Sequence, residues 1–194
     1  MKHEAKDFGH LVGKLSGLSA GQIEAHLGLY KGYVNKLNEI EEKLATADRT
    51  LANYSFGEYS ELKRREAVPF NGAYLHQKYF ENLSPTPGAR SKELDEAINA
   101  AFGSFDNYVK DLKASAGSTP GWVVTTWNKM DNKLHNYILF EHHIGLPVGQ
   151  HVLLALDCWE HAYMIDYGTK KPDYLEAFIK LVDWKVVSER FGKS

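Results

Sequence analysis

The 194-residue chain has 43% hydrophobic and 25% charged residues, a composition typical of a folded protein with room for one large domain or two small ones. Its 23 basic and 25 acidic residues give a formal net charge of −2 without long blocks of one sign, which argues against nucleic acid as a partner. The single cysteine excludes an internal disulfide, and because the start MKHEAKDFGH is polar and no window approaches the roughly 20 apolar residues of a membrane span, we expect a cytoplasmic protein with no membrane partner.

The first predicted element is a long helix over residues 19–47. Ser19 followed by Gln22 is a capping-box pattern that opens a helix. Apolar residues then recur at spacings of three and four, which is typical of one buried helix face: Ile23, Leu27, Tyr30, Val34, Leu37, Ile40 and Leu44. His26 and Tyr33 are seven residues apart, so both should lie on one face beside this stripe.

A second helical stretch covers residues 58–83. Pro69 lies inside it and is expected to kink the helix or to start a new segment, because proline lacks the backbone N–H that a helix interior needs. A short loop near residues 52–56 joins the two helices. This arrangement predicts an antiparallel hairpin.

The segment NLSPTPGARS at residues 82–91 has two prolines and a glycine and predicts a domain boundary. We therefore divide the chain into a helical hairpin domain (1–86) and an α/β domain (87–194). The second part begins with a predicted helix over 93–113, in which Gly103 is unfavourable, and ends with a predicted helix over 172–191.

Three short runs between these helices are β-branched or aromatic and are separated by turn residues. They are GWVVTTWN from residue 121, KLHNYILF from residue 133 and HVLLAL from residue 151. Such runs are typical of strands and predict a three-stranded antiparallel sheet. The predicted fold class is α+β, with a long antiparallel helical hairpin before an α/β domain.

The stretch ALDCWEHAYMIDY places a carboxylate and an imidazole beside a buried strand. Asp157 ends the apolar run and His161 follows four residues later, and burying such groups is costly unless a partner such as a metal ion compensates. With His26 and His76 they would supply three imidazoles and one carboxylate, a set that suits iron, manganese or zinc. Periodicity permits this convergence without showing it, and a hydrogen-bonded Asp–His pair that joins strand to helix is the alternative.

The run DCWEHAYMIDY closely resembles the D-x-W-E-H-A-Y-Y signature of the iron/manganese superoxide dismutases. The resemblance extends to IEAHLGLYKGYVNKLN, FNGAYLHQKYFENLSP, GWVVTTW and KKPDYLEAFIKLVDWKVV, and covers the chain from about residue 18 to residue 191 in the family's order. It implies a helical hairpin followed by an α/β domain with a three-stranded antiparallel sheet.

The resemblance also implies the residues of a metal site. The ligands of one iron or manganese ion per subunit fall on His26, His76, Asp157 and His161, with a solvent molecule as the fifth ligand. Tyr33 corresponds to the active-site tyrosine. The residue that bonds the bound solvent is His142, with His143 as the less favoured alternative. Further residues around the site are an aromatic shell of Phe80, Trp122 and Trp159 and two interface residues of a homodimer or higher oligomer, Glu160 and Tyr163.

Some positions depart from the family pattern. The spacing between His26 and Tyr33 is one residue shorter than usual, Tyr30 occupies the place of a histidine that gates the substrate funnel, and Phe80 stands where a tryptophan is usual. Val124 and Met164 replace a tryptophan and a tyrosine. These changes affect proton delivery and access more than metal binding.

The function implied is superoxide dismutation, in which superoxide is converted to dioxygen and hydrogen peroxide by redox cycling of the ion. Three alternatives stay open: a non-dismutating metal-binding or sensing protein on the same fold, a helical interaction protein without a metal, and a zinc hydrolase, for which no separate general base is evident. The sequence leaves the choice between iron and manganese open.

Overall fold

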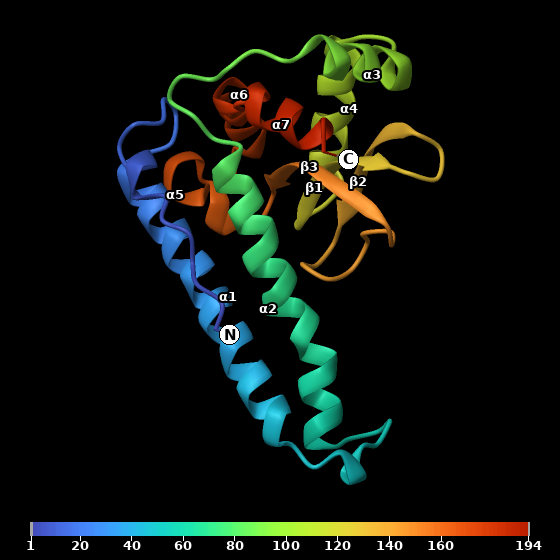
Figure 1. Cartoon of the computed structure of the whole chain (residues 1–194). Helices are drawn as coiled ribbons and strands as arrows, with labels where there is room; N and C mark the ends of the chain where they lie inside the picture. The colour runs from blue at the N-terminus through green and yellow to red at the C-terminus, as the bar shows by residue number, and fades with distance from the viewer. Residues whose placement is uncertain (1, 194) are drawn as a thin grey trace.

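The computed structural model describes residues 2–193 and begins with a long helical hairpin. Helix α1 (Ala20–Thr46) and helix α2 (Glu58–Glu81) run antiparallel, and their outer halves extend beyond the rest of the molecule (Figure 1). Ser19 caps α1 by accepting a hydrogen bond from the Gln22 amide at 3.1 Å. The predicted first helix and the hairpin are confirmed.

Helix α2 continues through Pro69 without a new segment, so the second of the two expectations for this proline is wrong. A proline removes only one backbone donor, and packing of the buried face against α1 holds the helix together across that position. The helix ends two residues before the predicted limit, because Leu83 leaves it to form an isolated bridge with Val182.

The three predicted strands form one antiparallel sheet in the order β2-β1-β3. Strand β1 (Trp122–Asn128) lies between β2 (Lys133–Leu139) and β3 (Gln150–Asp157). Trp122 is paired with Asp157 across the β1–β3 ladder, so the end of β3 lies beside the start of the central strand. The α+β prediction is confirmed.

Two predicted single helices are pairs of helices. The region 93–113 contains α3 (Lys92–Phe102) and α4 (Phe105–Gly117), because Gly103 adopts a left-handed φ of 82° that ends α3 and Ser104 caps α4. The tail contains α6 (Lys171–Leu181) and α7 (Trp184–Phe191). There the chain leaves the helix at the Val182 bridge, and the Asp183 side chain caps α7.

Short helical segments complete the fold. They are η1 (Gly9–Leu11), η2 (Arg49–Leu51), η3 (Glu160–Ala162) and α5 (Met164–Tyr167), none of which was predicted. The inner half of the hairpin and the sheet region share one hydrophobic core, so the division at residues 86/87 stays a prediction. Within residues 2–193, no helix is both long enough and apolar enough to cross a membrane.

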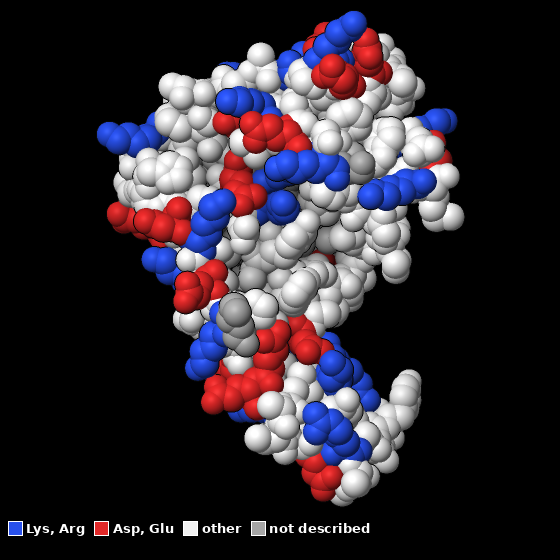
Figure 2. All heavy atoms as spheres, in the orientation of Figure 1, with Lys and Arg blue, Asp and Glu red and all other residues white. Residues whose placement is uncertain are grey.

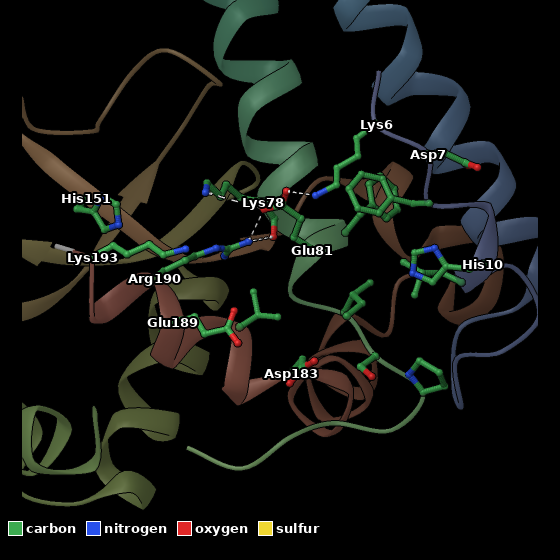
Figure 3. A pocket seen from close by; sticks show the side chains of 17 residues that line it. Lys6, Asp7, His10, Lys78, Glu81, His151, Asp183, Glu189, Arg190 and Lys193 are labelled. Carbon is green, nitrogen blue, oxygen red and sulfur yellow. Dashed lines mark hydrogen bonds and ion pairs between the residues drawn. The ribbon is translucent and has the colours of Figure 1, made fainter. Parts of the chain in front are cut away.

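Charged residues of both signs are interspersed on the face in Figure 2. One group of charged residues connects distant parts of the chain through hydrogen bonds and ion pairs. The Glu81 carboxylate at the end of α2 accepts hydrogen bonds from Lys6 at 3.0 Å and from Arg190 of α7 at 2.8 Å (Figure 3). Arg190 is buried and also donates to Asn82 and to the Leu153 carbonyl of β3, both at 2.6 Å. The N-terminal segment, α2, α7 and β3 therefore meet at this group.

We expect Glu81→Gln to weaken the fold in a pH-dependent way. Burial alone would raise the pKa of Glu81, but hydrogen bonds from Gln77 and Lys6 and the charge of Arg190 overcome it and lower the pKa to about 2. Because the folded pKa is below the unfolded one, the carboxylate's stabilisation is present above about pH 4.5 and is lost as the pH falls toward 2. The variant should lose about 1–3 kcal/mol at pH 7 and show a smaller decline between pH 4.5 and 2.

Urea unfolding as a function of pH measures this effect. Glu176→Gln is the matched control, because Glu176 pairs with Lys113 at 2.6 Å while its side chain is 59% exposed, and such pairs contribute little. Parallel pH curves for the wild type and Glu81→Gln would contradict the prediction.

Candidate metal centre

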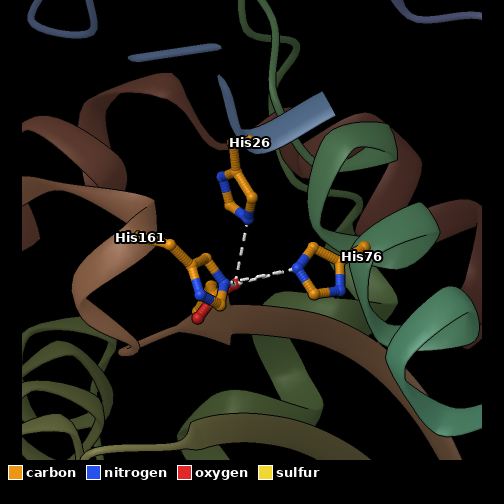
Figure 4. A group of neighbouring side chains, drawn as sticks. His26, His76 and His161 are labelled. Atoms are coloured by element: carbon orange, nitrogen blue, oxygen red, sulfur yellow. Dashed lines mark hydrogen bonds and ion pairs between the residues drawn. The ribbon is translucent and has the colours of Figure 1, made fainter. Parts of the chain in front are cut away.

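Four side chains from distant parts of the chain converge on one point in the interior. His26 comes from α1, His76 from α2, Asp157 from the end of β3 and His161 from η3 (Figure 4). Their candidate ligand atoms all lie within 4.8 Å of one another. The fold therefore places side by side the four residues whose convergence the sequence pattern allowed but did not show.

One carboxylate oxygen is the centre of this cluster. Oδ2 of Asp157 lies 3.0 Å from Nε2 of His26 and 3.1 Å from Nε2 of His161. Nε2 of His76 lies 3.6 Å from the same oxygen and 3.4 Å from Nε2 of His161. Three imidazole nitrogens thus face a single oxygen atom.

Burial sets the protonation of these groups. His26, His76 and Asp157 are fully buried, and desolvation lowers the pKa of His26 and lowers that of His76 to about 3. Burial would raise the pKa of Asp157, but hydrogen bonds and charge from His161, and then from His26, outweigh it and lower that pKa. Neutral His26 and His76 beside an ionised Asp157 are in the states that bind a metal ion.

The tautomer of His76 leaves a lone pair available to a metal ion. Nδ1 of His76 donates to the Gly72 carbonyl at 2.6 Å, so in the neutral ring Nε2 carries a lone pair. That lone pair lies 3.6 Å from Oδ2 of Asp157 and 3.4 Å from Nε2 of His161, so either a proton on His161 or a cation between the three atoms satisfies it. The donor set therefore fits iron, manganese or zinc, as three nitrogens and one oxygen do generally.

Two hydrogen bonds hold Asp157 from outside the cluster. Oδ1 of Asp157 accepts a hydrogen bond from the Trp159 amide at 2.9 Å, which leaves Oδ2 for the cluster. The Asp157 carbonyl accepts one from the Tyr174 hydroxyl at 2.8 Å. Such outer contacts orient ligand atoms and tune a bound metal.

The predicted aromatic residues surround the ligands. The Phe80 ring lies 4.9 Å from that of His26, and the Trp122 ring lies 5.0 Å from that of His76. Trp159 is stacked on His161 at 6.5 Å. Phe80 and Trp122 are buried, so this side of the cluster is shielded from water.

A chain of hydrogen bonds leads from the sheet to Tyr33. The Trp122 indole donates to Nδ1 of His142 at 2.9 Å, and Nε2 of His142 lies 2.6 Å from the Tyr33 hydroxyl. Burial lowers the pKa of His142, so the ring is neutral; because Nδ1 accepts, its proton is on Nε2 and is donated to Tyr33. His142 is buried while His143 is exposed, so the histidine in this chain of hydrogen bonds is His142.

Gly72, one turn before His76 on α2, is a further residue of the site. A Cβ atom there would lie 2.6 Å from Cδ1 of Tyr33, so only glycine lets the Tyr33 ring lie this close to α2. Its carbonyl also accepts a hydrogen bond from Nδ1 of His76. Spacing alone gave no signal for the contact with Tyr33, which depends on how the two helices pack.

Three further candidates lie at the edge of the site. Tyr30 is buried, its ring lies 6.0 Å from Phe80, and its hydroxyl accepts a hydrogen bond from the Lys6 amide at 3.0 Å; a gating role for it stays a prediction. Glu160 is exposed, and Tyr163 is buried and stacked on Tyr174 at 5.1 Å. Glu160, His161 and Tyr163 line one surface pocket of about 790 Å³.

Comparison with known proteins agrees with this geometry. The family model for the C-terminal domain of iron/manganese superoxide dismutases matches residues 90–190. An iron superoxide dismutase of Aquifex pyrophilus is 41% identical, with 100% of this chain and 92% of that protein covered, and one of Aquifex aeolicus is 40% identical, with 93% and 87% covered. A manganese superoxide dismutase of Haloarcula marismortui is 34% identical, with 85% and 80% covered. The chain belongs to the iron/manganese superoxide dismutase family.

Proposed function

We propose that the protein is a superoxide dismutase that converts two superoxide ions and two protons to dioxygen and hydrogen peroxide, with one iron or manganese ion per subunit. The observation that carries the proposal is the convergence of three imidazoles and one carboxylate within 4.8 Å. The names of the relatives, which include both iron and manganese enzymes, support it.

His26, His76, Asp157 and His161 would hold the metal, and the chemistry that a bound iron or manganese ion supplies is the transfer of single electrons. Asp157 is the one anionic member of the set. Three neutral imidazoles and a single carboxylate leave excess positive charge on a divalent or trivalent ion, which favours the approach of an anionic substrate.

The reaction also needs two protons, and the Tyr33–His142 pair can supply them. His142 carries its proton on Nε2 and donates a hydrogen bond to the Tyr33 oxygen. The hydroxyl hydrogen of Tyr33 therefore remains free for a substrate or solvent oxygen. Tyr33 is partly exposed, which connects the buried chain to bulk water. The hydrogen bond from the Trp122 indole to Nδ1 fixes the tautomer of His142.

A homodimer in the cytoplasm is part of the proposal. Glu160 is exposed beside His161, whose side chain is 24% exposed, so Glu160 can pair with His161 of the partner subunit across an interface. The one cysteine, Cys158, is buried and unpaired, which suits a reducing compartment.

Metal content and activity together test the function. Protein purified without chelators, and protein reconstituted separately with iron and manganese, should hold about one ion per chain and dismutate superoxide with at least one of them. Full occupancy without activity would favour a metal-binding or sensing protein. No retained metal under either loading would contradict the site itself.

We expect His142→Leu to lower the dismutation rate by about 10- to 100-fold while metal content stays near one ion per chain, because the variant loses the donor to Tyr33 and the acceptor for Trp122. His142→Gln should recover much of the rate, because an amide offers one acceptor and one donor in a similar arrangement. The matched control is His143→Gln, at an exposed neighbouring position. Equal rates for His142→Leu and the control would refute the assignment.

For Glu160→Ala we expect weaker dimerisation and metal release that is faster by about tenfold or more, because the pair across the interface orients a ligand. Sedimentation and chelator competition measure the two effects. Glu176→Ala, which removes an exposed carboxylate elsewhere, should change neither. Unchanged sedimentation and metal content in Glu160→Ala would count against the proposed interface.

A further inference from the structure

Gln22 does not complete the capping box that its position predicts. The Ser19 side chain accepts from the Gln22 amide, but the Gln22 side chain turns away from Ser19 and is fully buried. Its Nε2 donates to the His161 carbonyl at 2.6 Å, and its Oε1 accepts from the Ile165 amide at 3.1 Å. One side chain thus holds the main chain at both His161 and Ile165.

Another residue accepts the hydrogen bond from the Ser19 amide that Gln22 would accept in a capping box. The Ser19 amide donates to Oδ2 of Asp166 at 2.7 Å, and the Tyr167 hydroxyl donates to the Gly17 carbonyl. Hydrogen bonds therefore join residues 17–22, at the start of α1, to the segment 161–167. Only the second bond of the capping box, from the Ser19 amide to the Gln22 side chain, is missing, because Asp166 accepts from Ser19 and the Gln22 side chain bonds His161 and Ile165.

The segment that carries His161 needs such support. His161 lies in η3, a 3-10 helix of three residues, which is followed by the four-residue helix α5. Helices this short gain little from their own hydrogen bonds. Of the four candidate ligands, His161 is also the one whose side chain is partly exposed.

Gln22 and His26 are four residues apart and so lie on one face of α1, one turn from each other. Through His26 the helix supplies one candidate ligand, and through Gln22 it holds the main chain of another. The distance between these two ligands is then set by a single rigid element, which is how outer contacts fix a metal site.

We propose that Gln22 is a positioning residue for the metal ligand His161. Glutamine suits the position because the side chain must donate to one main-chain carbonyl and accept from one main-chain amide at the same time. The inference rests on the proposed function in so far as His161 binds a metal ion. The hold on segment 161–165 itself does not depend on the metal.

Two variants and one control test the proposal. Gln22→Met keeps the size of the side chain but removes both hydrogen bonds, while Gln22→Glu, studied at a pH at which the buried carboxyl is ionised, keeps the acceptor for Ile165 and loses the donor to His161. Tyr108→Phe is the control, because it removes another buried side-chain hydrogen bond, to Thr125 at 2.7 Å, in the sheet region. Unfolding free energies of the metal-free proteins separate local effects from general loss of stability.

The first measurement is amide hydrogen exchange in metal-free protein, and the second is metal release to a chelator together with the visible spectrum of the loaded protein. In Gln22→Met we expect exchange at Ile165 to be about tenfold faster, metal release to be about 10- to 100-fold faster and the spectrum to be shifted. In Gln22→Glu the Ile165 amide should stay protected while metal release is still accelerated. Tyr108→Phe should change none of these.

Metal release at the wild-type rate in Gln22→Glu, or equal acceleration in Tyr108→Phe, would overturn the proposal, since the effect would then be absent or general. If Gln22→Met does not fold, Gln22→Glu decides by the same criterion. If the wild type holds no metal, the proposed function fails and so does the role of His161 as a ligand. Hydrogen exchange in that case still reports whether Gln22 holds the segment.

Discussion

The structure depends on one buried arrangement, in which a carboxylate oxygen of Asp157 faces three imidazole nitrogens. A carboxylate without compensation is costly to bury, and the lone pair of His76 is a second acceptor in the same buried cluster. A cation at this point relieves both problems at once. Since the four side chains come from α1, α2, β3 and η3, the same cation would join the hairpin to the sheet region, and binding would stabilise the whole fold.

Hydrogen bonds outside the cluster hold three of the four candidate ligands. Asp157 is fixed by the Trp159 amide and the Tyr174 hydroxyl, His76 by the Gly72 carbonyl, and the main chain of His161 by Gln22. Gly72 has a double effect, because its carbonyl orients His76 and its missing side chain admits Tyr33. The ligand set and the Tyr33–His142 chain are therefore coupled through the backbone of α2, and a change in one is felt by the other.

Periodicity predicted the hairpin, and the β-branched runs predicted the sheet, because both signals are local and strong. The breaks at Gly103 and at Asp183 were missed for a related reason. Each flanking helix has its own apolar face, and two short faces in sequence are hard to tell from one long face. A left-handed glycine, Gly103, ends α3 before α4 begins. The bridge between Leu83 and Val182, which is a tertiary contact, separates α6 from α7.

The candidate ligands could be named from the sequence only through resemblance, since spacing cannot show that His26 and His76 meet Asp157. Gln22 and Gly72 were beyond both routes. Gln22 has the pattern of a capping box, and only the position of segment 161–165 in the fold turns its side chain elsewhere. The signal for Gly72 would be a helix glycine opposite a tyrosine, which has meaning only when the two helices are already packed.

The relatives include iron and manganese enzymes, and the donor set of three imidazoles and one carboxylate accommodates either ion. Discrimination between the two must then come from outside the ligands, where hydrogen bonds set how strongly each oxidation state is favoured. The outer contact that we propose in this chain is His142, held by Trp122 on one side and Tyr33 on the other. His142 follows β2 in the loop to β3, and its carbonyl is tied to α2 by Asn71 at 2.9 Å. The contact between that loop and α2 therefore sets where His142 lies relative to the candidate ligands.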